Sequence, residues 1–137
     1  MNLNRKSGFT LLEIIIVIII VGVLASLALP RFFSTVEFSR STEALASMSS
    51  LRQSVERCYL SQGGTYAGCT VGVLDIQNPQ NSPGAQFTYT ITAVAAAYTI
   101  AAQRNTVNGG DGGSRIFVIQ TTTGVSRSGT GVFIGIK

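Results

Sequence analysis

The sequence predicts an α+β fold in which one long N-terminal helix packs against an antiparallel β-sheet. An unbroken apolar run between Phe9 and Leu29 is followed by helical periodicity up to about Leu60. Short alternating apolar and polar segments then recur within residues 70–137, separated by turns rich in Gly, Ser and Thr. Consecutive strands with short connections favour antiparallel pairing, with one sheet face on the helix and the other in water.

The apolar run is long enough to cross a membrane. Its only strongly polar side chains are Thr10, Glu13 and Ser26. As a helix it is about 31 Å long, which matches a hydrocarbon core of about 30 Å. Arg5 and Lys6 precede the run, so the positive-inside rule keeps the N-terminus in the cytoplasm and sends the rest of the chain outward.

The carboxylate of Glu13 needs an explanation, because a charge at the bilayer centre costs about 2.5–3.5 kcal/mol on insertion scales. A cleaved secretory signal, with Ser26-Leu27-Ala28 as its cleavage site, does not require this acid. A capping box formed by Thr10 and Glu13 explains the spacing, but not the Gly8-Phe9 junction ahead of it. A third interpretation cuts the chain at that junction and pairs the carboxylate with the new α-amino group of a neighbouring identical helix.

The stretch RKSGFTLLE, with the apolar run that follows as far as Pro30, resembles the type III signal of type IV pilins and pseudopilins. The resemblance implies that prepilin peptidase cleaves after Gly8 and N-methylates Phe9, and that Glu13 is the assembly glutamate. Gly22 and Pro30 stand where many family members carry helix-weakening residues. The short leader and the phenylalanine are most similar to the type IVa group.

This resemblance implies a structural filament subunit that polymerises into a helical homopolymer through its N-terminal helix and supports adhesion, twitching motility or DNA uptake. The implied partners are identical subunits, prepilin peptidase, an inner-membrane assembly platform with an ATPase motor, and the membrane before assembly. We expect the chain in the bacterial inner membrane, with its head outside the cytoplasm, and then in an extracellular filament. A pseudopilin of a type II secretion system is the alternative within the family, and a signal-anchored extracytoplasmic binding domain is the alternative outside it.

The expected organisation is a leader peptide at 1–8, a transmembrane and filament-core helix at 9–30, its amphipathic continuation at 31–61, and a globular β-sheet head at 62–137. Proline inside a helix removes one hydrogen bond and produces a kink, so we expect one long curved helix. Apolar residues recur at helical spacing in its second half, and they form a stripe that must pack on the sheet: Ala44, Met48, Leu51, Val55 and Cys58.

Four segments have the pattern of strands. Phe87, Tyr89 and Ile91 alternate with polar residues, and a very short link follows, as in a hairpin. The predicted strands are 86–92, 97–103, 115–120 and 131–137.

Two cysteines, Cys58 and Cys69, are close in sequence and fit a short disulfide loop. Such bonds persist outside the cytosol, where the apolar segment would deliver this part of the chain. Closing the loop would stabilise the head by about 3 kcal/mol in the chain-entropy model. Two buried free thiols are the alternative interpretation.

The composition argues against an enzyme and against a cofactor or metal site. The chain has no histidine, which excludes ordinary imidazole acid–base chemistry and the usual activation of serine or cysteine. Asn108, Asp111 and Ser114 in the segment NGGDGGSR offer oxygen ligands, but one carboxylate is a thin ligand set for calcium. A flexible turn is therefore the preferred interpretation of this segment.

Basic residues in the head raise the question of a nucleic-acid contact. Arg104, Arg115, Arg127 and Lys137 could gather in one patch on the head, although the formal net charge of the whole chain is only +4. Scattered solvated charges are the preferred interpretation of these residues, and binding of DNA is the alternative.

Overall fold

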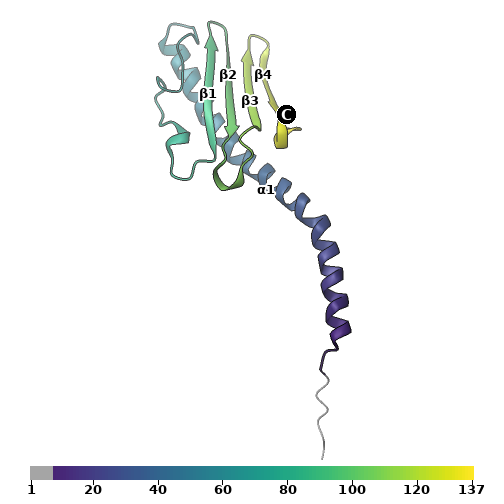
Figure 1. Cartoon of the computed structure of the whole chain (residues 1–137). Coiled ribbons are helices and arrows are strands. Elements are labelled where there is room, and N and C mark those ends of the chain that lie inside the picture. Colours follow the sequence, from purple (N-terminus) through teal and green to yellow (C-terminus); the bar gives the residue numbers. More distant parts are fainter. Residues whose placement is uncertain (1–7) are drawn as a thin grey trace, which may run out of the picture. The chain divides into compact units, whose positions relative to one another are not determined.

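The structure is a computed structural model that describes residues 8–137, so the predicted leader, 1–8, lies outside the described residues except for Gly8. It consists of one long helix, α1 (Leu11–Ser61), followed by a four-stranded sheet (Figure 1). The chain divides into two compact units between Thr35 and Val36. The strands are β1 (Phe87–Val94), β2 (Ala97–Arg104), β3 (Arg115–Thr121) and β4 (Gly124–Gly129).

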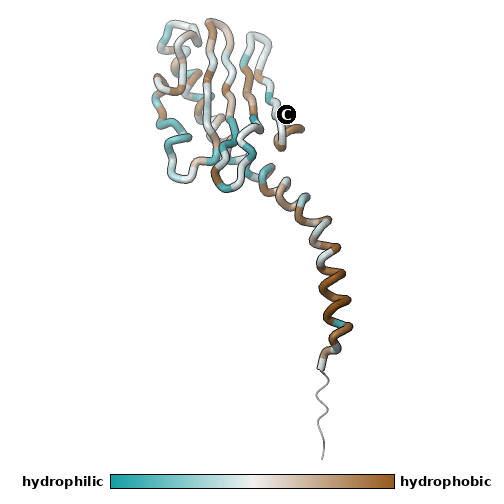
Figure 2. Tube along the Cα trace, in the orientation of Figure 1, coloured by the Kyte–Doolittle hydropathy of each residue, from teal (hydrophilic) through white to brown (hydrophobic). Residues whose placement is uncertain are grey.

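The N-terminal unit presents its apolar side chains on the outside. Hydrophobic residues colour the N-terminal part of α1 almost without interruption in Figure 2. α1 contains a window long and apolar enough to cross a membrane, and that window is 0% buried within the chain. Leu11 and Leu27 are 80% and 71% exposed, far more than a soluble protein tolerates along a whole helix, so another apolar surface or lipid must cover them.

The second unit contains the sheet and the C-terminal part of α1. The strands follow one another in the order β1-β2-β3-β4, and each pair is antiparallel. The predicted α+β architecture is therefore confirmed. The expected hairpin is confirmed as well, since Phe87 pairs with Arg104 and Val94 with Ala97. Alternate residues of β1 are buried, beginning with Phe87 and Tyr89, as a sheet with one covered face requires.

The predicted helical stripe forms one side of the hydrophobic core. All five of its residues are buried: Ala44, Met48, Leu51, Val55 and Cys58. They cluster with the inward side chains of the strands. Ile100, Ala102 and Ile116 are fully buried, so the helix stripe and the sheet's inner face exclude water together, which is the main favourable term in folding.

The predicted strand at 131–137 is wrong. β4 lies earlier, and the chain then enters a 3-10 turn, Gly131–Phe133. Gly131 and Gly135 have positive φ values of 64° and 105°, a region that an extended strand does not use. The turn lets Phe133 and Ile136 both point into the core, whereas a strand would place residues three apart on opposite faces.

Candidate functional site

The first candidate site is the start of α1. The backbone N–H of Glu13 donates to Thr10 Oγ1 at 3.3 Å, and the N–H of Ile14 donates to the Thr10 carbonyl oxygen at 3.3 Å. The Thr10 side chain therefore caps the helix, because it satisfies the Glu13 N–H, which would otherwise lack an intrahelical acceptor. This is one half of the capping box that the spacing of Thr10 and Glu13 suggests. The reciprocal bond, from the Thr10 backbone N–H to the Glu13 carboxylate, does not occur among residues 8–137.

The Glu13 carboxylate has no partner within the part of the chain that the structure describes. No hydrogen bond or ion pair of the described residues involves the Glu13 carboxylate. The residue is exposed among apolar side chains. A helix N-terminus favours a negative charge by up to about 1 kcal/mol at the surface, which offsets only part of the cost in hydrocarbon. The local structure therefore leaves the acid available for a group on another molecule.

Gly22 and Pro30 lie farther along the apolar part of α1. Neither residue is required by packing within the chain. A Cβ added at Gly22 would meet nothing within 4 Å. Pro30 is inside the helix, where it cannot donate a hydrogen bond to the carbonyl of Ser26. Both residues lower the stability of an isolated helix. Their roles in assembly, like those of Phe9 and Glu13, stay predictions.

A buried ion pair, which the sequence analysis missed, ties α1 to the sheet. The Arg104 side chain is 0% exposed. Its Nε donates to Glu37 Oε2 at 2.9 Å, and its Nη1 donates to the carbonyl oxygen of Gln86 at 3.0 Å. Arg40 donates to Glu37 Oε1 at 2.6 Å. Chiefly through the Arg104 hydrogen bond, these cations lower the pKa of Glu37 below its ordinary range.

Strand periodicity could have found this arginine. Tyr98, Ile100 and Ala102 point inward from β2, and extending their period of two by one residue places Arg104 on the same face. Arg104 is therefore not part of the surface charge that the sequence analysis considered. The interpretation of Arg104 as a solvated surface cation is wrong, because the pair with Glu37 compensates its burial.

A second network, made of hydrogen bonds to Glu56, joins α1 to the segment that follows it and to β2. Glu56 accepts hydrogen bonds from the hydroxyls of Tyr66 at 2.9 Å and Tyr98 at 2.8 Å. The rings of Tyr66 and Tyr98 meet edge-on with centroids 4.8 Å apart. Burial first, and then the hydrogen bond to Glu56, raises the pKa of Tyr66 to about 12, and the same two causes raise the pKa of Tyr98.

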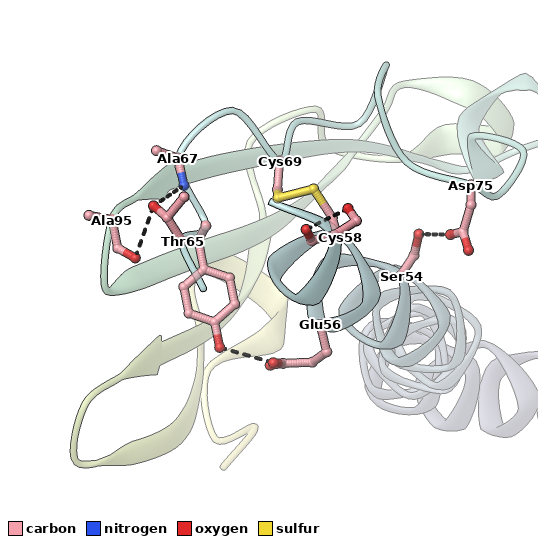
Figure 3. The surroundings of a disulfide bond; sticks show 10 residues. Ser54, Glu56, Cys58, Thr65, Ala67, Cys69, Asp75 and Ala95 are labelled. Carbon is pink, nitrogen blue, oxygen red and sulfur yellow. Dashed lines mark hydrogen bonds between the residues drawn. A yellow bond between two sulfur atoms is a disulfide. The ribbon is translucent and has the colours of Figure 1, made fainter. Parts of the chain in front are cut away.

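The two cysteines are joined in a disulfide bond between the end of α1 and the loop after it (Figure 3). Ser54 donates a hydrogen bond to Asp75 in the same region. Arg57 donates to both oxygens of that carboxylate, at 2.6 and 2.9 Å. These bonds, led by those from Arg57 and Ser54, lower the pKa of Asp75 to about 2. The loop is thus held by one covalent bond and one bidentate ion pair.

The segment NGGDGGSR is a turn whose carboxylate is used internally. Asp111 accepts hydrogen bonds from the backbone N–H groups of Gly113 and Ser114 at 3.2 and 3.1 Å, and from the Ser114 hydroxyl. No group of three or more metal-ligating side chains occurs in the described residues. The arrangement is that of an Asx turn, in agreement with the preferred interpretation of the sequence.

The remaining basic residues of the head separate onto different surfaces. Arg127 and Lys137 line one hollow together with Arg52 of α1. Arg115 is exposed and precedes Ile116, which is buried in the core, so Arg115 lies on the outer face of the sheet. The four cations named by the sequence analysis therefore do not form one patch.

Comparison with known proteins identifies relatives of the chain. Residues 3–29 match the family described as "Prokaryotic N-terminal methylation motif". A probable minor fimbrial protein of Dichelobacter nodosus is 42% identical over 66 residues, which is 48% of this chain and 41% of that protein. The type IV major fimbrial protein FimA of the same organism is 34% identical over 70 residues, covering 50% of this chain and 44% of FimA.

A secretion protein is similar as well. The type II secretion system core protein G of Aeromonas hydrophila is 38% identical over 56 residues, which is 41% of this chain and 39% of that protein. The matched region covers less than half of the length of each of these relatives. No solved structure matches the chain at a significant level. The similarity is thus shared between fimbrial proteins and a secretion-system protein.

Proposed function

Since the chain belongs to the type IV pilin family, we propose that its mature form is a structural subunit of a type IV pilus filament. The family consists of structural proteins rather than enzymes, as expected from the composition. The apolar half of α1 would form the filament core, and the sheet head would face outward and carry the surface properties. Adhesion, twitching motility and DNA uptake are the surface functions that such a filament would support.

One observation carries the proposal: a helix with a fully exposed apolar surface holds an acid that has no partner among residues 8–137. Lipid can cover the apolar side chains but cannot compensate the Glu13 charge. A neighbouring identical helix can do both, if cleavage after Gly8 exposes the α-amino group of Phe9. The pair of opposite charges would offset the desolvation of each. It would also fix the register between neighbouring helices.

The proposed life of the chain has two stages. Before assembly, α1 would anchor it in the bacterial inner membrane with the head outside the cytoplasm, since Arg5 and Lys6 precede the apolar run. Prepilin peptidase would then remove residues 1–8 and methylate Phe9. An inner-membrane platform with an ATPase motor would extract the subunit into the growing filament. Van der Waals contacts between helices would replace those with lipid.

Mass spectrometry of the mature N-terminus tests the proposal. Purified from its membrane, the chain is expected to begin with an N-methylated Phe9. A Gly8→Val variant provides the control, because a β-branched side chain at the cleavage position should leave the leader attached. A mature chain that begins at Leu29, or one that keeps Met1, would contradict the proposal in favour of a secretory signal or a signal-anchored binding domain.

A pseudopilin of a type II secretion system is the second candidate, favoured by the similarity to core protein G. Both candidates would carry a methylated Phe9, so the N-terminus does not separate them. Shearing of intact cells does, because a pilus subunit is expected among the sheared surface fibres. A subunit that is methylated, absent from those fibres, and needed for release of secreted enzymes would be a pseudopilin.

A further inference from the structure

The acidic side chains of the second unit, Val36–Lys137, which is called the head from here on, are bonded within the chain, with one exception. Glu37, Glu56, Asp75 and Asp111 each accept hydrogen bonds from arginine, tyrosine or serine side chains. In the described part of the chain, Glu43 has no side-chain hydrogen bond and no ion pair. Glu43 is also exposed.

Glu43 lies at the rim of a hollow beside the β1 edge of the sheet. The hollow has a volume of about 120 Å³ and is lined by α1, by β1 and by the segment before β1, including Ser47, Gln86 and Tyr89. The Oε1 atom of Gln86 is buried and has no hydrogen-bond partner in the described residues. Because the Gln86 oxygen is buried, the acceptor that another molecule can reach at this hollow is the exposed Glu43 carboxylate.

The chemistry of the hollow fits a cationic side chain. Arginine carries five N–H donors and no acceptor, and lysine carries three donors. A guanidinium can donate to both oxygens of a carboxylate at the same time, because its N–H groups are arranged in a fixed planar fork. An anionic ligand, or a neutral ligand that only accepts hydrogen bonds, would leave Glu43 without a donor.

The opposite edge of the same head presents cations without acids. A hollow of about 450 Å³ is lined by Arg52, Arg127 and Lys137 together with Val125 and Ser126. No ion pair of the described residues involves any of these three cations. No carboxylate of the described residues therefore pairs with these three cations at contact distance, whereas Glu37 and Asp75 each pair with an arginine.

Helix geometry places the two hollows on opposite sides of the head. Glu43 and Arg52 are nine residues apart, and nine residues at about 100° each make two and a half turns, so the two side chains leave the helix on opposite sides. The first hollow includes side chains of β1 and the second includes side chains of β4, and these are the two edge strands of the sheet (Figure 1). The acceptors and the cations thus cannot meet within one chain.

We propose that these two hollows are the two halves of one interface between neighbouring copies of this chain. Arg127 of one copy, beside Arg52 and Lys137, donates to Glu43 of the next copy. Because each copy uses two different surfaces, the contact is heterologous, and it propagates along a polymer instead of closing a dimer. The inference rests on the proposed function, since a filament brings many copies of the head side by side.

A second copy explains more than other occupants do. An anionic polymer at the cationic hollow would satisfy Arg52 and Arg127 but would leave the Glu43 charge without a donor. Two copies satisfy both hollows with one contact. Charge complementarity of this kind mainly fixes the register and suppresses wrong pairings, which a helical filament needs between neighbouring heads.

Charge reversal and charge exchange in the full-length chain test the interface. Glu43→Lys and Arg127→Glu are each expected to lower the yield of sheared fibres about tenfold, because each places like charges opposite one another in every contact. The combined variant restores an opposite-charge pair and is expected to recover most of the yield. Arg115→Glu is the matched control, since this exposed cation lies on the outer sheet face, and it should leave the yield unchanged. Equal membrane levels of all variants show that the heads fold.

Cysteine cross-linking measures the contact directly. The chain's own cysteines are bonded to each other, so introduced thiols have no native partner. Under mild oxidation, fibres of the double variant Glu43→Cys, Arg127→Cys should yield a ladder of covalent oligomers. The pair Glu43→Cys, Arg115→Cys should give none.

The outcomes separate the interface from the proposed function. Normal fibres from both single reversals, together with no ladder from the first cysteine pair, would overturn the interface while leaving the filament intact. Loss of binding to a DNA or heparin column in Arg127→Glu, with fibre yield unchanged, would overturn it in favour of an anionic polymer. An unmethylated Phe9 in a wild-type chain that forms no fibres would remove the proposed function and the interface with it.

Discussion

The Nε atom of Arg104 lies 2.9 Å from the Oε2 atom of Glu37 and joins the end of β2 to α1. The arginine is fully buried, whereas the Glu37 side chain is 18% exposed. The guanidinium also donates to the backbone carbonyl oxygens of Gln86 and Asn105. A buried cation with several acceptors is held in one position, so this pair fixes where the sheet docks on the helix.

Removing one partner of this pair should destabilise the head strongly. We expect Glu37→Ala to lower the free energy of unfolding by about 3–5 kcal/mol, because it leaves the Arg104 guanidinium buried without compensation. Glu43→Ala removes an exposed acid of the same helix and should change the free energy by less than about 0.5 kcal/mol. Urea unfolding of the full-length protein in detergent measures both. Similar losses in the two variants would contradict the role of the pair.

The same pair should make stability depend on pH. The folded state lowers the pKa of Glu37, so its contribution is complete above the unfolded value near 4.3 and is lost as the pH falls through the lower folded value. We expect the urea midpoint to decrease as the pH falls below about 4.3. Glu37→Gln should reduce the slope of the urea midpoint against pH. The hydrogen-bonded carboxylates of Asp75 and Asp111 should account for the remaining slope. An unchanged slope in the variant would exclude Glu37 as its source.

The disulfide should contribute to the stability of the head but not to its fold. Cys58 and Cys69 are eleven residues apart, and opening a loop of this size costs about 3 kcal/mol in the chain-entropy model. We expect the double variant Cys58→Ser, Cys69→Ser to lose about 3 kcal/mol of unfolding free energy. It should therefore unfold at a lower urea concentration. A reducing agent should shift the wild-type protein equally and leave the variant unchanged. Equal stability of the oxidised and reduced wild-type protein would contradict this prediction.

The tyrosines that are hydrogen-bonded to Glu56 should lose their protons only at high pH. The pKa of Tyr66 is raised to about 12, first by burial and then by its hydrogen bond to Glu56. The stability linked to this proton is complete below the unfolded value near 10 and is lost as the pH rises through about 12. Glu56→Gln should move the tyrosinate absorbance transition to lower pH, because the neighbouring negative charge is removed. Asp75→Asn, which changes an acid away from these rings, should leave the transition in place.

Glu13 should be required for the polymer and not for the head. Glu13→Gln keeps a similar shape but removes the charge, so we expect membrane levels and head stability to be unchanged and sheared fibres to be strongly reduced. The Thr10 bond to the backbone N–H of residue 13 is independent of that side chain, so the helix should still begin at the same place. Normal fibre yield in this variant would contradict the proposed pairing of the carboxylate with the α-amino group of a neighbouring copy.

Local patterns in the sequence predicted the helix and the strands correctly where a single buried face of the element decides its conformation. The helical stripe from Ala44 to Cys58 and the alternation in β1 both depend on a single buried face, which a period of 3.6 or of 2 records directly. The conformation of the segment after Gly129 could not be predicted from such a period. Its chain reversal depends on Gly131, where a Cβ would lie 2.0 Å from Ser114 Oγ, a contact between residues far apart in sequence.

The sequence by itself determined the apolar segment, the RKSGFTLLE motif, the long helix and three of the four strands, because each is encoded by residues that are neighbours along the chain. Only the tertiary structure decided which charges are satisfied. It buried Arg104 against Glu37, and it left Glu43 and Arg52 on opposite sides of the head. The physical reason is that the free energy of a charge depends on what surrounds it in space, and that surrounding comes from segments distant in sequence.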